Sequence, residues 1–302
     1  MDNLTQYLDR MAKSTGETSK NRLLDFIPKD AKCILDFGCA DGFLTEKIAT
    51  AFPNATIIGY DKDETRIKLA KDYHKQPNIM FTSSSWEAFG YYSGAFDAII
   101  LSSVLHEVFS YDDDVYHIHS PFSYERLDTT LLNLKGYLSQ HGRLLIRDGV
   151  KDNRYTPVRI HFKEADGPEW LDRFKNEFKG LPYEGVIITK IDDMTYEFSS
   201  EDYAREFMYT YTWGAESWYR EIQEQFGYYN EKEYVAYLED LGFTVVNHSA
   251  FTELGYYYYL GKKLDFTDKD NNPIDLPYST IFIVANKNIT SITSNPEEIC
   301  LR

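Results

Sequence analysis

The sequence is poor in the features that mark secreted, membrane-spanning and nucleic-acid-binding proteins. Only 3 of its 302 residues are cysteine, too few for a disulfide framework, and their spacing fits no metal centre. It has no apolar run long enough to cross a membrane. Lys and Arg number 32 against 48 Asp and Glu, so the net charge of −16 repels a phosphate backbone. We therefore expect neither a membrane nor DNA as a partner.

The start of the chain and its cysteines predict a cytoplasmic location. Met-Asp-Asn-Leu-Thr-Gln lacks the basic and apolar pattern of a secretion signal. Cys33 and Cys39 fall in an apolar run and in the turn after it, which suits reduced, buried thiols. A hydrophobic content of 43% and this length fit one large or two modest globular domains.

The most informative segment lies between Cys33 and Asp61. An apolar run from Cys33 to Phe37 ends in a turn of small residues, 38–42. A helical pattern follows, and a second apolar run ends at Asp61. This strand, turn, helix and strand, with a carboxylate about 20 residues after the turn, is the layout of a nucleotide-like ligand site. Backbone N–H groups would face the ligand, and the carboxylate would take its ribose hydroxyls.

The spacing of the turn distinguishes between cofactors. A dinucleotide fingerprint needs Gly-x-Gly-x-x-Gly, whereas this turn has Gly38-x-Ala40-x-Gly42. Phe43 stands where the third glycine belongs, which argues against NAD and FAD. The turn resembles motif I of the class I S-adenosylmethionine-dependent methyltransferases. The resemblance extends over residues 30–150 and, more loosely, over 231–286.

The order of strand and helix patterns predicts an α/β fold. Alternation along the chain indicates a parallel sheet with helices on both faces. The resemblance implies a Rossmann-like, seven-stranded, mostly parallel sheet whose final strand inserts antiparallel. Strands are predicted at 33–37, 56–60, 78–82, 95–101, 142–148, 243–250 and 278–285, and helices near 41–51, 63–73, 125–139 and 231–242.

Domain organisation is predicted around a long insertion after the fifth strand, at 150–230. Ligands bind beyond the carboxyl ends of strands in open α/β sheets, so we interpret this insertion as a cap that shapes the acceptor pocket. An insertion that mediates dimerisation is the alternative. The other predicted parts are an N-terminal helical lead (1–30), a cofactor-binding core (31–149), a completion of the core sheet (231–286) and a flexible tail (287–302).

The resemblance implies a set of cofactor-binding residues. In the family an Asp after the third strand usually accepts from the adenine, and Ser85 and Trp86 stand there in this chain. A hydroxyl or a carbonyl would have to accept instead, and a polar loop with a helix cap is the alternative. The implied contacts are Asp36, Gly38, Ala40 and Gly42 for the methionine part, Asp61 for the ribose, Lys62, Ser85 and Trp86 for the adenine, and Ser102 along the cofactor.

Two residues are candidates for the chemistry itself. The sequence Val104-Leu105-His106 after the fourth strand resembles the family's motif IV, which implies that His106 lies near the reactive methyl group. Methyl transfer needs an aligned nucleophile and, for a hydroxyl or ammonium acceptor, removal of a proton. An imidazole with an ordinary pKa near 6.5 can take that proton. Asp148, at the end of the fifth strand, is the second candidate base or acceptor-binding group.

The acceptor is less well defined by the sequence. Arg147 could pair with a substrate carboxylate, although a structural ion pair with a loop acid is the favoured interpretation. Tyr211, Trp213 and Trp218 lie beside acids in the insertion, so they could hold an amine, stack on a ring, or pack the cap. The acids and histidines between His106 and His119 reproduce no metal motif, and we predict no metal.

These patterns together predict an S-adenosylmethionine-dependent methyltransferase that acts on a small molecule, at oxygen or nitrogen. A methyltransferase of tRNA or other RNA on the same core is the first alternative. A catalytically silent, methyltransferase-like binding subunit is the second. A homodimer is a further expectation.

Overall fold

The main sheet of the computed structural model has seven strands in the order β3-β2-β1-β4-β5-β11-β9. The structure describes residues 17–84, 92–111 and 121–287. Neighbours among the first five strands run parallel, and β11 is antiparallel to both β5 and β9. This confirms the predicted fold class. The strands are β1 (Cys33–Phe37), β2 (Thr56–Tyr60), β3 (Ile79–Thr82), β4 (Phe96–Ser102), β5 (Leu138–Asp148), β9 (Phe243–Phe251) and β11 (Thr280–Lys287).

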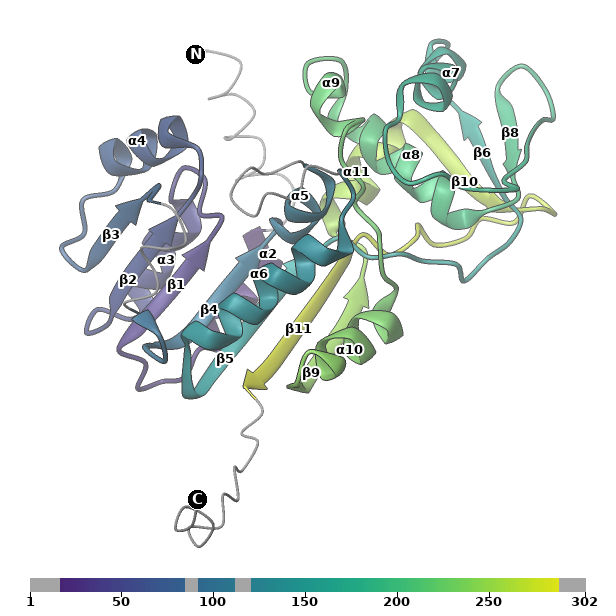
Figure 1. The fold of residues 1–302 in the computed structure, drawn as a ribbon. Helices are drawn as coiled ribbons and strands as arrows, with labels where there is room; N and C mark the ends of the chain where they lie inside the picture. The colour runs from purple at the N-terminus through teal and green to yellow at the C-terminus, as the bar shows by residue number, and fades with distance from the viewer. Residues whose placement is uncertain (1–16, 85–91, 112–120, 288–302) are drawn as a thin grey trace, which may run out of the picture.

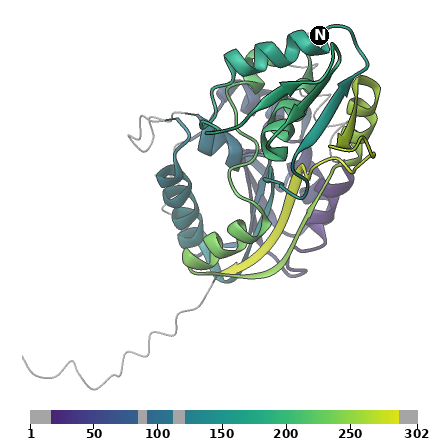
Figure 2. The same cartoon turned by 90° about the vertical axis from the view of Figure 1, so that its right-hand side faces the viewer.

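Helices cover both faces of this sheet, which explains why its central strands are apolar throughout. Leu131 and Leu238 belong to the hydrophobic cluster on one face, whereas Leu23 and Ile48 belong to the cluster on the other. Figure 2 shows the purple N-terminal helices on the opposite side of the sheet from the later, teal and green ones. The helices are α2 (Glu17–Leu24), α3 (Phe43–Ala51), α4 (Glu64–Tyr73), α5 (Leu105–Ser110), α6 (Tyr124–Tyr137) and α10 (Glu231–Asp240).

A second sheet, in the order β10-β6-β8-β7, forms a separate body with its own hydrophobic cluster. Phe162, Phe174 and Phe207 pack edge to face within it. Figure 1 shows this body beyond the end of the main sheet that carries α5. Its elements are β6 (Val158–Phe162), α7 (Gly167–Glu177), β7 (Ile188–Lys190), β8 (Thr195–Phe198), α8 (Glu201–Trp213), α9 (Trp218–Glu221), α11 (Leu254–Lys263) and β10 (Leu264–Asp268).

One predicted boundary needs correction. We expected residues 231–286 to complete the main sheet, and β9 and β11 do so. However, β10 pairs antiparallel with β6 from Leu264↔Phe162 to Asp268↔Val158. The segment between β9 and β11 therefore serves the second body, because its strand supplies hydrogen bonds to an edge of β6 that would otherwise lack them. Within the described ranges, no helix is long and apolar enough to cross a membrane.

Candidate functional site

The turn after β1 is built from left-handed backbone. Gly38, Ala40 and Gly42 have φ values of 79°, 49° and 85°, a region that glycine enters without strain. A side chain at position 38 would collide with Val104, and a Cβ at position 42 would lie 2.7 Å from the Phe81 ring. The N–H of Gly38 donates to the carbonyl of Tyr60 at 2.7 Å. The turn therefore lies directly against the ends of β2 and β4.

Asp61 follows β2 and holds this turn. Its Oδ2 accepts the N–H of Ala40 at 2.9 Å, and its Oδ1 accepts the N–H of Asp63 at 2.9 Å. Arg66 of α4 lies 3.6 Å from the same carboxylate. Sequence reasoning missed Arg66, although its position three residues after the helix cap Asp63 is a usable signal. Asp61 is thus fixed in place with a hollow on its open side.

Asp36 lies behind the turn and is fully buried, with 1% of its surface exposed. Thr45 of α3 donates to its Oδ2 at 2.6 Å. Burial raises the pKa of Asp36 to about 6, although the Thr45 hydrogen bond opposes the shift. This carboxylate links β1 to α3 and is one of the groups that line the hollow beside the turn.

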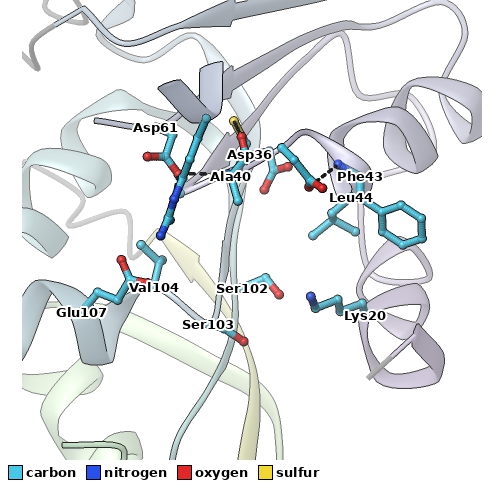
Figure 3. Close-up of a pocket in the computed structure, with 14 residues that line it drawn as sticks. Lys20, Asp36, Ala40, Phe43, Leu44, Asp61, Ser102, Ser103, Val104 and Glu107 are labelled. Atoms are coloured by element: carbon cyan, nitrogen blue, oxygen red, sulfur yellow. Dashed lines mark hydrogen bonds and ion pairs between the residues drawn. The ribbon is translucent and has the colours of Figure 1, made fainter. Parts of the chain in front are cut away.

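A hollow beside this turn, which we call the turn hollow, lies at the carboxyl ends of β1, β2 and β4 (Figure 3). The Oγ of Ser102, at the end of β4, is buried there and has no hydrogen-bond partner among the residues that the structure describes. Lys20 reaches the same hollow from α2 and was not predicted, because it lies outside every motif. The lining residues are Lys20, Asp36, Gly38, Cys39, Ala40, Asp41, Phe43, Leu44, Asp61, Arg66, Ser102, Ser103, Val104 and Glu107.

A second hollow, the α5 hollow, adjoins the first and shares Gly38, Asp61, Val104 and Glu107 with it. Lys62 lines it, with its Nζ 6.0 Å from the centre of the Tyr111 ring. Phe37 and Tyr60 stack 5.0 Å apart on another wall. This hollow offers the aromatic and apolar surface that a purine ring needs. Ser85 and Trp86 lie outside the described residues.

The third hollow, the cap hollow, contains both residues predicted for catalysis. The Nδ1 of His106 lies 2.7 Å from Asp148 Oδ1. Asp148 Oδ2 accepts the N–H groups of Val104 and Leu105, at 3.0 and 2.6 Å. Gly149 N–H donates to Oδ1 at 2.7 Å. Because so many donors satisfy Asp148, it orients His106 and has little capacity left for a substrate proton.

His106 is held between two carboxylates. Its Nε2 lies 3.5 Å from Glu224 Oε2, opposite the bond to Asp148. Burial lowers the pKa of His106, but Asp148 and Glu224 outweigh it and raise the pKa well above the ordinary value. The pKa of His106 thus departs upward from the ordinary value near 6.5, because each ring nitrogen faces a negative charge that favours the cationic imidazole.

The cap hollow joins the two bodies of the molecule. Trp213, Glu221, Phe226 and Tyr256 come from the second body or the segments attached to it. Glu221 is 1% exposed and Glu224 is 2% exposed. Lys20, Ser103 and Glu107 line both the cap hollow and the turn hollow. Sequence reasoning missed Lys20, Glu107, Glu224 and Tyr256 as site residues, since no spacing links these distant segments.

The remaining predicted substrate residues lie elsewhere or are engaged. Arg147 borders the cap hollow, but its guanidinium is 2.6 Å from Glu253 and donates to Ser19 and Ser103 at 2.7 Å each. Tyr211 stacks on Phe207, 5.5 Å apart, and Trp218 donates to Glu177 at 2.7 Å. Tyr211 and Trp218 belong to the hydrophobic cluster of the second body and line none of the three hollows.

The described ranges contain no group of three or more His, Cys, Asp or Glu side chains placed to hold an ion. The sequence places several acids and histidines between His106 and His119. Most of them lie outside the described ranges, namely residues 112–114, His117 and His119.

Comparison with known proteins identifies the family. A family model described as a methyltransferase domain matches residues 28–198, more than half of the chain. The chain belongs to the class I S-adenosylmethionine-dependent methyltransferase family, as motif I and the strand order indicate.

Individual relatives are more distant. A malonyl-[acyl-carrier protein] O-methyltransferase of Halalkalibacterium halodurans is 37% identical over 71 residues, 22% of this chain and 26% of that protein. The chain thus spans about a quarter of that relative's length. A geranyl diphosphate methyltransferase solved with GPP and sinefungin has a TM-score of 0.51 at 11% identity, covering 90% of this chain and 78% of that one. A SAM-dependent methyltransferase of Methanosarcina mazei has a TM-score of 0.47 at 13% identity, covering 87% and 95%.

The residues of the turn hollow fit the family's cofactor, S-adenosylmethionine. The missing side chains at Gly38 and Gly42 let the turn pack directly on Val104 and Phe81, which holds its backbone along the hollow. Asp61 presents a fixed carboxylate to ribose hydroxyls. The buried hydroxyl of Ser102, which has no partner within the described ranges, would gain one from a polar ligand.

Proposed function

We propose that this protein transfers a methyl group from S-adenosylmethionine to a small molecule bound in the cap hollow. The observation that carries this proposal is the sharing of Lys20, Ser103 and Glu107 between the cap hollow and the turn hollow. Molecules in the two hollows would be neighbours. When bound, the cofactor supplies a methyl group already activated by a positively charged sulfur.

The chain's own contribution is alignment and exclusion of water. Asp61, Ser102 and the backbone around Ala40 would hold the donor in the turn hollow. Trp213, Phe226 and Tyr256 would close the acceptor side, because they are contributed by the second body opposite the strand ends. We propose on this basis that the insertion over 150–230 acts as a cap.

We propose that His106 accepts a proton from the acceptor and that Asp148 orients the ring. The raised pKa of His106 favours the protonated ring, and only the neutral ring can act as a base. The transfer rate to a hydroxyl or ammonium acceptor should therefore rise with pH above neutrality. A carboxylate acceptor needs no base, and its rate would not show this rise.

The walls of the cap hollow favour an acceptor that bears an amine. Glu221 is a buried acid that lines this hollow together with Trp213 and Tyr256. Glu224 lines it too, but its carboxylate already faces His106 and accepts from Tyr111 at 2.6 Å. Ion pairs with carboxylates and contacts with aromatic faces both stabilise a cation. The net charge of −16 disfavours a phosphate backbone, so we place RNA second as the acceptor.

The experiment is a transfer assay with S-adenosylmethionine labelled in its methyl group, offered a metabolite extract or total RNA. We expect label in the low-molecular-weight fraction. Glu221→Gln should reduce it at least tenfold, whereas Glu216→Gln, at an exposed site in the same segment, should leave it unchanged. Label in RNA alone would contradict the small-molecule proposal. No label in either pool, with cofactor binding intact, would favour a silent subunit.

A further inference from the structure

We propose that Lys20, on the N-terminal helix α2, binds the carboxylate of the methionine part of the cofactor. The inference rests on the assignment of the turn hollow to S-adenosylmethionine. Lys20 lies before residue 28, where the match to the family model begins. No motif therefore assigns it a role.

Helix α2 is attached firmly enough to define where Lys20 lies. Leu23 is fully buried against the core. Ser19 accepts from Arg147 Nε at 2.7 Å and donates to Glu253 through a short hydrogen bond. Arg143 donates to the carbonyl of Phe26, just beyond the helix, at 2.9 Å. These contacts come from β5 and from the segment after β9, so α2 is fixed to the main sheet on both sides of Lys20.

The position of Lys20 in the turn hollow corresponds to one end of the ligand. In Figure 3 its amine points into the hollow near Ser102, at the opposite end from Asp61. If Asp61 takes the ribose, the methionine part extends toward Lys20. That part carries an ammonium and a carboxylate. Asp36 and Asp41 line the same hollow and would attract the ammonium but repel the carboxylate. A cation is needed to offset that repulsion.

Lys20 is available for this role. Within the described ranges we find no hydrogen bond or ion pair from its amine, although the residue is half-buried. Arg66, which also lines the turn hollow, pairs with Asp61, and Arg147 in the adjoining cap hollow pairs with Glu253. Burial, and then the charge of Arg147, lower the pKa of Lys20 to about 8. A bound carboxylate would compensate for both effects, which makes the site selective for an anion at this end.

Calorimetry with two ligands tests the assignment without reference to activity. S-adenosylhomocysteine carries the amino-acid group, whereas 5′-methylthioadenosine has the same nucleoside without it. Lys20→Met should weaken binding of S-adenosylhomocysteine about tenfold to a hundredfold and leave 5′-methylthioadenosine unchanged. Lys20→Arg should restore part of the loss, since it keeps the charge. Lys29→Met, at an exposed position beyond the same helix, is the matched control and should change neither affinity.

Two results would overturn the role of Lys20 and leave the cofactor assignment intact. Unchanged binding of S-adenosylhomocysteine to Lys20→Met would show that the carboxylate lies elsewhere. An equal loss for both ligands would show that Lys20 shapes the hollow without contacting the carboxylate. If the wild-type protein bound neither ligand, the cofactor assignment would fail together with this inference. If only the proposal about the acceptor were wrong, the binding results expected for these two ligands would not change.

Discussion

Single residues in this protein carry charges whose environment differs sharply from water. His106 is the clearest case, because Asp148 and Glu224 face its two nitrogens at 2.7 and 3.5 Å while the surrounding chain buries it. Asp148 is in turn satisfied by three backbone N–H groups. Removing one member of such a buried set leaves the others uncompensated, which is costly. The site is therefore sensitive to pH through a small number of groups.

The stability of the protein should fall as pH rises from about 6.5 to 8. The folded-state pKa of His106 is raised above its unfolded value, so the native state retains a proton there that the unfolded chain loses. Its stabilising effect is complete below about pH 6.5 and disappears as pH rises through the folded-state pKa. The slope should approach 1.4 kcal/mol per pH unit for one proton, measured by urea unfolding.

A matched pair of variants isolates this effect. His106→Gln should reduce the slope over that pH range. Burial raises the pKa of Glu201 to about 7, so the lower part of the range keeps a smaller slope of the same sign. His248→Gln should retain it, because His248 forms its ion pair with Glu231 at an exposed site. Above about pH 8 Lys20 adds a slope of opposite sign, since its pKa is lowered to about 8. An identical slope in wild type and His106→Gln would contradict the assignment.

At the scale of elements, a short strap over residues 224–229 positions the wall of the cap hollow. The carboxylate of Glu206 on α8 accepts the N–H groups of Phe226 and Gly227, at 3.2 and 2.8 Å. Arg205, fully buried, lies 2.5 Å from the same carboxylate. Lys151 N–H donates to the carbonyl of Tyr229 at 2.8 Å. The strap therefore connects α8 to the end of β5.

Gly227→Ala should destabilise the protein by about 1–3 kcal/mol, because an added methyl group would collide with the guanidinium of Arg205 in a packed interior. Gly136→Ala is the control. Gly136 lies in α6 with no atom within 4 Å of an added Cβ, so alanine should be neutral or stabilising by about 0.5–1 kcal/mol. Urea unfolding measures both. Equal stability of the two variants would show that Arg205 and the chain around Gly227 accommodate the added methyl group at little cost.

Over the whole molecule, the dominant feature is negative charge spread over two bodies. A net charge of −16 makes the folded state repel itself. Added salt screens this repulsion over about 10 Å at 0.1 M. The melting temperature should thus rise by roughly 1–2 °C between low and physiological ionic strength, which corresponds to about 1 kcal/mol for a chain of this size. Scanning calorimetry at several NaCl concentrations tests this, and a fall would show that attractive ion pairs dominate.

The sequence by itself determined the nucleotide-binding half of the protein. Apolar runs such as Cys33–Phe37 and the small residues at 38–42 specify their local structure through steric demands that act within a few residues. Asp61 follows directly from the end of a strand. These local rules are why the seven-stranded sheet and the turn were predictable.

Only the tertiary structure decided the acceptor side. Lys20, His106, Glu224 and Tyr256 meet in one hollow although long stretches of chain separate them. The pairing of β10 with β6 and the charged state of His106 likewise depend on contacts between distant segments. Periodicity and spacing carry no information on such contacts, because burial and electrostatic fields are set by whatever folding brings near.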